Sequence, residues 1–377
     1  MQTTLPPELR DTDDGRDAER ILRTCVHCGF CNATCPTYQL LGDERDGPRG
    51  RIYQIKEMLE HGRASEEARL HLDRCLTCRS CETTCPSGVE YHRLLEIGRD
   101  FVERTMRRPL AERLRRDVLL ATVPQPDRLR PLLAVARSVR PLLPSPLARS
   151  VPGVAEAVAW PASGHARSVL LLEGCVQSVS HPRINAAAAR VLDRLGVRAV
   201  PAAGCCGALA HHMSREERMR ATLRRNIDAW SQLIEDGTEA ILLTASGCAP
   251  TVQDYGRLLR NDPVYAERAA RLSELAIDIS EFIERQDLSA LRPDLATDRP
   301  IAFHSPCSLQ HGLKRGGRVE TLLTGLGFRL TPVADAHLCC GSAGSYAVLQ
   351  QGLSERLLSN KIPNLEAGDP ALIATAN

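Results

Sequence analysis

The sequence predicts an α+β protein in which a mostly helical N-terminal domain is followed by two copies of an α/β domain. Three observations lead to this prediction. The 377 residues include fifteen cysteines, which fall into two separate blocks. The block from Cys25 to Cys85 contains two short motifs of identical spacing. The block from Cys175 to Cys340 belongs to a longer pattern that occurs twice.

Composition narrows the class of protein. Hydrophobic residues make up 43% of the chain and charged residues 25%, which is typical of a soluble globular protein. A net charge of +2 and only 3% aromatic residues argue against a nucleic-acid binder. We find no apolar run long enough to span a membrane and no signal peptide at the start. So many cysteines without a secretion signal predict cytoplasmic metal or redox chemistry rather than disulfides.

The first element is a pair of cysteine motifs, CVHCGFCNATCP at 25–36 and CLTCRSCETTCP at 75–86. Both follow C-x2-C-x2-C-x3-C-P, the ferredoxin-type pattern for [4Fe–4S] clusters, in which the fourth cysteine ligates the other cluster. We therefore expect two clusters with crossed ligands. The expected sets are Cys25, Cys28, Cys31 and Cys85 for the first, and Cys75, Cys78, Cys81 and Cys35 for the second. Structural zinc is the competing interpretation, but it uses separate C-x2-C pairs with four ligands per metal.

A helix is predicted between the two motifs. Its apolar face consists of Ile52, Ile55, Met58 and Leu59. Arg49 and Arg51 lie near its start, after Pro48. Two interpretations of these arginines stay open. Either they lie over a cluster and tune its reduction potential, or they are solvated residues of a helix start.

The next element, 99–165, is rich in arginine and proline and predicts one or two helices followed by a proline-broken connector. Several leucines accompany its arginines, as in helices that lie on a membrane interface. These are Leu119, Leu120, Leu132, Leu133, Leu142 and Leu143. The segment could therefore lie on anionic lipid or on a partner subunit. The alternative is a solvated linker.

The remainder of the chain repeats itself. VLLLEGC ends at Cys175 and IAFHSPC ends at Cys307, an offset of 132 residues (307 − 175). AGCCG and HLCCG are offset by 134 residues (339 − 205). Each copy alternates strand-like and helical runs, which predicts a mostly parallel sheet with the cysteines beyond the carboxyl ends of strands. Aligning TASGC with the final TAN places a further cysteine beyond Asn377, so we expect the second copy to be incomplete.

The cysteines of the repeats are candidate ligands of a metal or of a further iron–sulfur cluster, because adjacent cysteines rarely serve packing. They are Cys175, Cys205, Cys206, Cys248, Cys307, Cys339 and Cys340. Thiol redox chemistry without a metal is the alternative. Four histidines lie nearby in sequence and are either ligands, proton relays or structural residues. They are His211, His212, His304 and His337.

These patterns predict four segments. They are a dicluster [4Fe–4S] ferredoxin-type domain at 1–98, a helical connector at 99–165, a first CCG domain at 166–296 and a second at 297–377. No G-x-G-x-x-G follows a strand, so we expect no flavin or NAD in this chain. Any hydride chemistry would then belong to another subunit. A zinc-stapled interaction protein remains as a non-enzymatic alternative.

The stretch from Cys25 to Met58, together with the two CCG domains, resembles the iron–sulfur subunits of bacterial glycolate oxidases. This resemblance implies an alpha-helical ferredoxin domain and an electron-transfer subunit that is not itself catalytic toward the hydroxy acid. It also implies two flavoprotein-type partner subunits that oxidise glycolate to glyoxylate, and a quinone-type acceptor in the membrane. The implied location is the cytoplasm, peripheral to the inner face of the cell membrane.

The wider group that the chain resembles includes heterodisulfide reductase B-type subunits, lactate-utilisation proteins and the anaerobic glycerol-3-phosphate dehydrogenase C subunit. This implies an alternative function, in which the CCG domains have a thiol or quinone reductase site of their own. Heterodisulfide reductase-like CCG motifs end in C-x2-C and hold a noncubane cluster. Here Cys248 is followed by Ala249, Pro250 and Thr251, so the role of these domains stays open.

Overall fold

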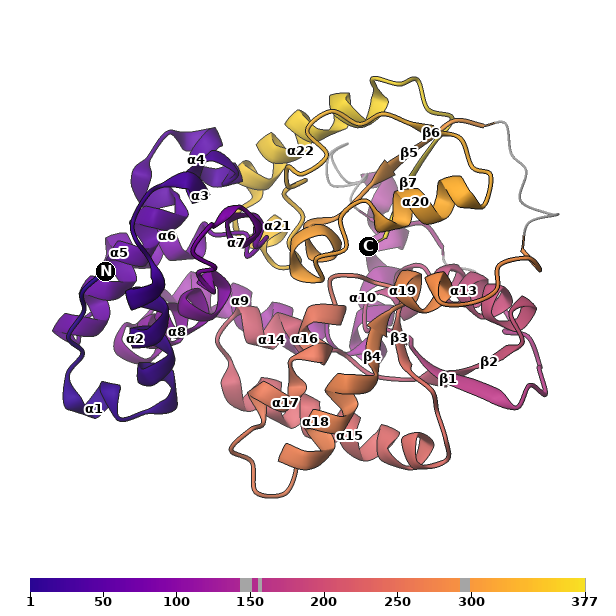
Figure 1. Ribbon diagram of the computed structural model, residues 1–377, viewed down its shortest axis with the longest axis horizontal. Coiled ribbons are helices and arrows are strands. Elements are labelled where there is room, and N and C mark those ends of the chain that lie inside the picture. The colour runs from indigo at the N-terminus through magenta and orange to yellow at the C-terminus, as the bar shows by residue number, and fades with distance from the viewer. Residues whose placement is uncertain (143–150, 155–157, 292–298, 377) are drawn as a thin grey trace. The chain divides into compact units, whose positions relative to one another are not determined.

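The structure, a computed structural model, describes residues 1–142, 151–154, 158–291 and 299–376. The chain forms two compact units. The first contains 1–112, 299–321 and 329–375, so it combines the N-terminal helices with most of the second repeat (Figure 1). The second contains 113–298 and 322–328, with the chain end, and holds the first repeat.

The N-terminal part is helical, as predicted. Its elements are α1 (Pro7–Arg10), α2 (Asp13–Thr24), α3 (Phe30–Ala33), α4 (Pro36–Leu41), η1 (Glu44–Asp46), α5 (Pro48–His61), α6 (Glu66–Asp73), α7 (Ser80–Thr84) and α8 (Tyr91–Thr105). The predicted helix between the motifs is α5, with proline in its first turn and the left-handed Gly62 after its end. Ile52, Ile55, Met58 and Leu59 are all buried, which confirms the predicted apolar face.

The core of this part lies between α2, α5 and α8. Leu22, Ile55 and Leu94 are completely inaccessible to solvent and belong to one apolar cluster. Cys25, Cys75 and Cys81 lie in the same cluster. The cysteine loops are therefore attached to the most tightly packed region of the domain, which holds them in place.

The second repeat contributes a parallel sheet to the same unit, with strand order β6–β5–β7. Its elements are β5 (Ile301–His304), η4 (Ser308–Gly312), α20 (Arg318–Gly325), β6 (Leu330–Thr331), α21 (Tyr346–Leu349), α22 (Gln351–Glu366) and β7 (Leu372–Thr375). Ile301 pairs with Leu330 on one side and with Leu372 on the other.

The first repeat forms a four-stranded parallel sheet of order β2–β1–β3–β4. Its principal elements are β1 (Arg167–Leu172), α13 (Arg183–Arg194), β2 (Val197–Ala202), α15 (Glu216–Glu235), β3 (Ile241–Leu243) and β4 (Ala276–Asp278). Val169, Leu171 and Leu242 are buried in its core. Strands β1, β2 and β3 occupy the same places in this sheet as β5, β6 and β7 do in the other sheet. The predicted repeat is therefore confirmed as two copies of one α/β topology. Strand β4 has no counterpart in the second copy among the described residues.

Further helices complete the second unit and the connector. They are α9 (Leu110–Thr122), α10 (Pro126–Val139), η2 (Arg140–Leu142), α12 (Gln177–Ser180), α14 (Ala208–His212), α16 (Ala249–Gln253), α17 (Tyr255–Leu258), α18 (Ala266–Leu275) and α19 (Ile279–Glu284). Of the connector leucines, Leu120 is buried, whereas Leu132 and Leu142 are exposed. Leu143, Pro144 and Pro146 lie outside the described residues.

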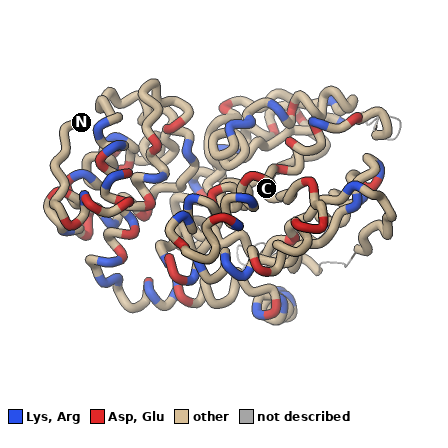
Figure 2. The backbone as a smooth tube through the Cα atoms, turned by 60° about the horizontal axis from the view of Figure 1, so that its bottom comes forward, with Lys and Arg blue, Asp and Glu red and all other residues tan. Residues whose placement is uncertain are grey.

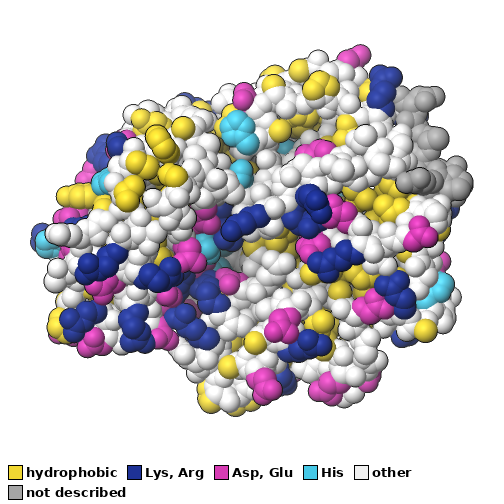
Figure 3. Space-filling model, in the orientation of Figure 1, with side chains coloured by type: hydrophobic (Ala, Val, Ile, Leu, Met, Phe, Trp, Pro, Cys, Tyr) yellow, Lys and Arg dark blue, Asp and Glu magenta, His cyan; other side chains and the backbone are white. Residues whose placement is uncertain are grey.

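Charged residues of both signs are interspersed along the chain (Figure 2). On the face drawn in Figure 3, basic and acidic side chains lie next to one another rather than in separate patches. This agrees with the small net charge of +2.

Candidate iron–sulfur and thiol sites

The eight N-terminal cysteines gather around two neighbouring pockets. One pocket is lined by Cys25, Cys28, Cys31 and Cys85. The other is lined by Cys35, Cys75, Cys78 and Cys81, and Cys81 also borders the first pocket. The structure thus brings the fourth cysteine of each motif together with the first three cysteines of the other motif.

Two short helices cause this exchange. Helices α3 and α7 lie side by side, and the hydroxyl oxygens of Thr34 and Thr84 are 3.0 Å apart. Thr34 also donates a hydrogen bond to the backbone carbonyl of Ser80 at 3.4 Å. Cys35 and Cys85 directly follow these threonines. Each cysteine therefore lies at the end of its own short helix and lines the pocket of the other motif.

Left-handed backbone shapes the two cysteine loops in the same way. His27 and Gly29 have φ values of 60° and 87°, and the equivalent Thr77 and Arg79 have φ values of 56° and 62°. Alternating left- and right-handed residues turn successive N–H groups toward one side and form a concave site for an anion, as around many iron–sulfur clusters. Only Gly29 gave a sequence signal for this conformation.

The chemistry of these thiols fits iron–sulfur clusters. Burial raises the pKa of Cys31 to about 11, and it also raises the pKa of Cys25, Cys35 and Cys81 above their ordinary value. Such thiols become thiolates only beside a compensating positive charge, which bound iron provides. Four thiols around each pocket are the donor set that a [4Fe–4S] cluster uses.

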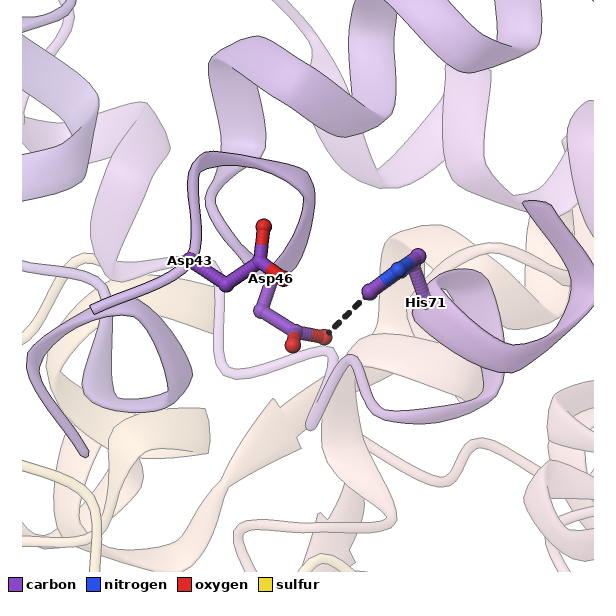
Figure 4. A group of neighbouring side chains, drawn as sticks. All are labelled: Asp43, Asp46 and His71. Carbon is purple, nitrogen blue, oxygen red and sulfur yellow. Dashed lines mark ion pairs between the residues drawn. The ribbon is translucent and has the colours of Figure 1, made fainter. Parts of the chain in front are cut away.

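A buried charge network borders the second pocket. The Asp46 carboxylate forms ion pairs with Arg74 Nη1 at 3.0 Å and with Arg51 Nη2 at 3.4 Å. It also lies 2.9 Å from His71 Nδ1 (Figure 4). Arg51 Nη1 also reaches Cys35 Sγ at 3.9 Å. Burial alone would lower the pKa of Arg51, but Cys75 and other nearby anionic groups raise it above its ordinary value. Arg51 is therefore a fixed positive charge next to the second pocket.

Asp43, Asp46 and His71 are also close enough together to suggest a cation site (Figure 4). However, Asp43 accepts hydrogen bonds from Arg45, and Asp46 pairs with two arginines. Guanidinium groups already satisfy both carboxylates, so this group is part of the charge network and not a metal site.

The first repeat brings its four cysteines together at the carboxyl ends of β1, β2 and β3. The Cys205 thiol has those of Cys175 and Cys206 as neighbours, and Cys206 has Cys248 as a further neighbour. The pKa of Cys205 falls to about 3 because Cys175 and Cys206 donate hydrogen bonds to its sulfur. Over the described residues, no three cysteine sulfurs lie within 4.8 Å of one another. The thiols form an open chain, which suits a cluster better than a single metal ion.

The loop that carries Cys205 and Cys206 is held by α15 and α17. Asn226 Nδ2 donates to the Cys205 carbonyl at 2.7 Å, and the Tyr255 hydroxyl donates to the Cys206 carbonyl at 3.0 Å. Gly207 has a φ of 87°, and a Cβ on it would lie 2.8 Å from Leu223. Backbone conformation and packing both require glycine there, as the CCG pattern implied.

The second repeat has a similar chain of thiols. The Cys339 thiol has those of Cys307 and Cys340 as neighbours. His304 is hydrogen-bonded to Cys340 and, through Nδ1, lies 3.1 Å from Thr375 Oγ1. Hydrogen bonds from Cys307 and Cys340 lower the pKa of Cys339 to about 5. His304, one of the four histidines named from the sequence, therefore lies beside a cysteine of this repeat.

The other three histidines named from the sequence lie elsewhere in the two repeats. His211 and His212 lie in α14, directly after the Cys-Cys-Gly loop, and His337 is exposed near Cys339. Sequence reasoning missed His311, which is buried and has Nδ1 2.9 Å from the Thr83 hydroxyl. Nothing in its local sequence marks it, because its partner lies 228 residues earlier.

The second repeat and the helical domain share an apolar cluster within their unit. Leu76, Cys339, Tyr346 and Leu357 are buried together in it, with Cys78 and Cys307 packed against them. Cys307 is thus a neighbour of Cys78, a cysteine of the second pocket. Arg356 of α22 adds a hydrogen bond to the Leu40 carbonyl at 3.2 Å. The cysteines of the second repeat and the second cysteine pocket therefore border the same apolar cluster.

Among the described helices, none combines the length and the apolar character that crossing a bilayer requires.

Two family models match the chain. A model described as a 4Fe-4S dicluster domain matches residues 21–89, and a model described as a cysteine-rich domain, CCG, matches residues 169–253 and 301–377. These ranges contain the two cysteine pockets and the two repeats. The match to the 4Fe-4S dicluster domain agrees with the iron–sulfur chemistry predicted from the cysteine motifs.

Related proteins match over most of the chain. The glycolate oxidase iron-sulfur subunit of Escherichia coli (strain K12) is 52% identical over 380 residues, covering 100% of this chain and 93% of that protein. The probable glycolate oxidase iron-sulfur subunit of Bacillus subtilis (strain 168) is 30% identical, covering 94% of this chain and 86% of that protein. Lactate utilization protein A of Shouchella clausii (strain KSM-K16) is 24% identical and covers 56% of this chain and 87% of that protein.

Proposed function

The chain belongs to the family of glycolate oxidase iron–sulfur subunits, and we propose that it carries electrons within a complex that oxidises glycolate to glyoxylate. Family membership supports an electron-transfer role in a multisubunit oxidoreductase. The observation that supports the finer proposal is the grouping of eight cysteines into two neighbouring pockets. Two neighbouring [4Fe–4S] clusters would form a path along which single electrons pass.

We assign the ligands of the two clusters from this grouping. Cys25, Cys28, Cys31 and Cys85 would hold one [4Fe–4S] cluster, and Cys75, Cys78, Cys81 and Cys35 the other. When bound, each cluster supplies a one-electron carrier. The protein contributes thiolate ligands, apolar walls that exclude water and the fixed charge of Arg51. The Tyr91 hydroxyl adds a hydrogen bond to Cys75 Sγ at 3.7 Å, which favours the reduced cluster.

The first repeat is proposed as a further metal or iron–sulfur site held by Cys175, Cys205, Cys206 and Cys248. The open chain of sulfurs favours a cluster with more than one metal ion over a single zinc ion. Its low-pKa thiol, Cys205, is already prepared to bind a cation.

The electrons are proposed to come from two flavoprotein-type subunits and to leave toward a quinone-type acceptor in the membrane. This subunit would not act on the hydroxy acid by itself. Helices α10 and η2 are the proposed membrane-facing segment on the cytoplasmic side. Leu132, Val135 and Leu142 are exposed there, beside several arginines. Flotation of the purified chain with anionic liposomes at low salt tests this contact, and no flotation would remove it.

A second candidate function is supported by the thiols of the second repeat. In it, the chain belongs to a lactate, glycerol-3-phosphate or heterodisulfide oxidoreductase and has a thiol or quinone reductase site of its own. Cys307 and Cys340 are partly buried cysteines that could form such a site. Turnover of a disulfide or quinone by the purified chain with an artificial reductant would favour it.

Cluster assembly and complex activity together test the leading proposal. Anaerobically reconstituted protein should contain about eight irons from the two clusters, plus any iron of the first repeat. Cys28→Ser and Cys78→Ser should each remove iron and abolish glycolate-dependent reduction of an acceptor by the complete complex. Cys248→Ser is the matched control, since it should leave both cubane signals in place. Iron-free protein, or full activity in both N-terminal variants, would refute the proposal.

A further inference from the structure

A small cavity lies between helices α4 and α22 of the first unit. Its volume is about 70 Å³, and Leu40, Leu338 and Leu357 are among its apolar walls. Arg356 of α22 donates its 3.2 Å hydrogen bond to the Leu40 carbonyl of α4 beside this cavity. A hydrogen bond and apolar contacts therefore hold the two helices together at this place.

A buried lysine lines the cavity. Lys361 is 2% exposed, and its Nζ donates hydrogen bonds to the carbonyls of Asp335 and Ala336, both at 3.1 Å. An ammonium group has three N–H donors, so one is left for a ligand. Over the part of the chain that the structure describes, Lys361 forms no ion pair with a carboxylate. The cavity therefore has a buried positive charge that lacks a carboxylate counterion.

The first repeat shows that the fold does not require this lysine. Leu223 and Leu357 lie next to the equivalent glycines of the two Cys-Cys-Gly loops, so α15 and α22 correspond with an offset of 134 residues (357 − 223). The same offset relates Lys361 to Ile227, which is 1% exposed (361 − 227). Burying an ammonium group costs free energy that an isoleucine avoids, so the lysine indicates a role other than packing.

We propose that Lys361 belongs to a binding site for a small carboxylate anion, with Asn360 and Asn364 as further polar groups. All three residues line the cavity, and Asn364 lies three and four residues after the other two on α22. The ammonium group would pair with the carboxylate, and the amide N–H groups would donate to its oxygens. None of these residues is a proposed cluster ligand, so the site goes beyond the proposed electron transfer.

The size of the cavity favours a ligand of about two carbons. One water molecule takes about 10–15 Å³ of such a volume, so about 70 Å³ has room for about five non-hydrogen atoms. Acetate and glycolate are of this size, and the apolar walls can accommodate their carbon atoms. A substituted quinone ring is too large for the same space.

The cavity can be reached from solvent. Gln39 and Asn360 line it and are exposed, whereas Lys361 is buried. A small anion can therefore enter past these two polar side chains while α4 and α22 stay folded.

The cavity is also next to the second cysteine pocket, because Pro36 directly follows Cys35 and lines both. A carboxylate at Lys361 offsets a positive charge near that pocket, which disfavours the more negative, reduced form of a cluster. Bound carboxylate would therefore lower the reduction potential of the second cluster. This consequence, unlike the site itself, rests on the proposed function.

Thermal unfolding and titration calorimetry of the complete reconstituted chain test the site. The probes are acetate, glycolate, phosphate and chloride, compared at equal ionic strength. Acetate and glycolate should raise the melting temperature in a saturable way, whereas chloride should not. Redox titration followed by EPR should show that glycolate lowers the potential of the second cluster.

Lys361→Ile is the principal variant, because the first repeat already has isoleucine at the equivalent position. Without ligand it should be at least as stable as the wild type, and it should bind acetate and glycolate at least about tenfold more weakly. Asn364→Leu keeps the lysine but fills the cavity, so it should also lose binding even if Lys361→Ile folds poorly. Lys314→Met removes an exposed lysine of the same repeat and should bind like the wild type.

The outcomes separate this inference from the proposed function. Equal affinity of the wild type and Lys361→Ile, or equal affinity for phosphate and acetate, would overturn the carboxylate site. Iron-loaded wild type that binds neither acetate nor glycolate would also overturn this inference alone. Protein that binds glycolate but takes up no iron would overturn the proposed function and leave the site standing.

Discussion

The guanidinium group of Arg51 lies 3.9 Å from the sulfur of Cys35, in a region where Arg51 is only 1% exposed. The same side chain donates to Thr37 Oγ1 at 3.1 Å and to the His71 carbonyl at 2.7 Å. These contacts fix a positive charge next to the second pocket. The first pocket has Arg49 instead, which is about one-third exposed and pairs with Glu44.

Replacing Arg51 should lower the reduction potential of the second cluster. R51Q removes a buried positive charge that favours the more negative, reduced cluster, so the expected decrease is on the order of 50 mV. R51K keeps the charge and should shift the potential less. R49Q is the matched control, because solvent screens Arg49 and the first cluster should shift only slightly. Redox titration followed by EPR measures each potential, and equal shifts in R51Q and R49Q would contradict this account.

Asp46 should be important for stability. Its carboxylate is completely buried and pairs with Arg51, His71 and Arg74. D46N would leave the Arg51 and Arg74 guanidinium groups without their counterion, at a cost of about 3–5 kcal/mol of unfolding free energy. Asp43→Asn, in the same loop but exposed on one side, should cost less than about 1 kcal/mol. Denaturant unfolding compares the two variants, and similar losses would argue against the network.

Local spacing predicted the cysteine pockets, but it did not predict this charge network. The cysteine spacing of the motifs at 25–36 and 75–86 predicted that the fourth cysteine of each motif joins the other pocket. The constant offset between the two repeats predicted that they share one topology. Arg51 was a candidate from its place at a helix start. Asp46 and His71 were missed because their roles depend on three segments meeting in the fold.

The contact between Cys78 and Cys307 was also invisible in the sequence. The two residues are 229 positions apart (307 − 78), and nothing in the local sequence around either cysteine indicates the other. Strand β4 was missed for a different reason. At three residues, Ala276–Asp278, it is too short to produce a periodic pattern.

Stability should depend on pH through His311. Burial lowers the pKa of His311 below its ordinary 6.5, so the unfolded chain binds this proton more readily than the folded chain. The contribution is therefore fully present above about pH 6.5 and is lost as the pH falls toward the folded-state pKa. H311N keeps an acceptor near Thr83 but does not titrate, so its unfolding free energy should fall less between pH 7.5 and 5.5. Parallel wild-type and H311N curves would contradict the prediction.

Gly341 should tolerate no side chain. Its φ is 82°, and a Cβ would lie 2.6 Å from the Ser354 carbonyl oxygen. G341A should lower the unfolding free energy by about 2 kcal/mol or more, because backbone strain and a steric clash add together. Gly317 has a similar φ of 78° with nothing within 4 Å, so G317A measures the strain alone. Thermal unfolding should show the larger loss for G341A.

The exchange of the fourth cysteine between motifs is tested most directly by EPR of the reduced protein carrying single serine substitutions. We predict that C85S perturbs the same cluster signal as C28S, and that C35S perturbs the same signal as C78S. Each pair shares one pocket in the structure. If C85S instead changed the signal affected by C78S, or if none of the four changed any signal, the assignment of two crossed clusters would be wrong.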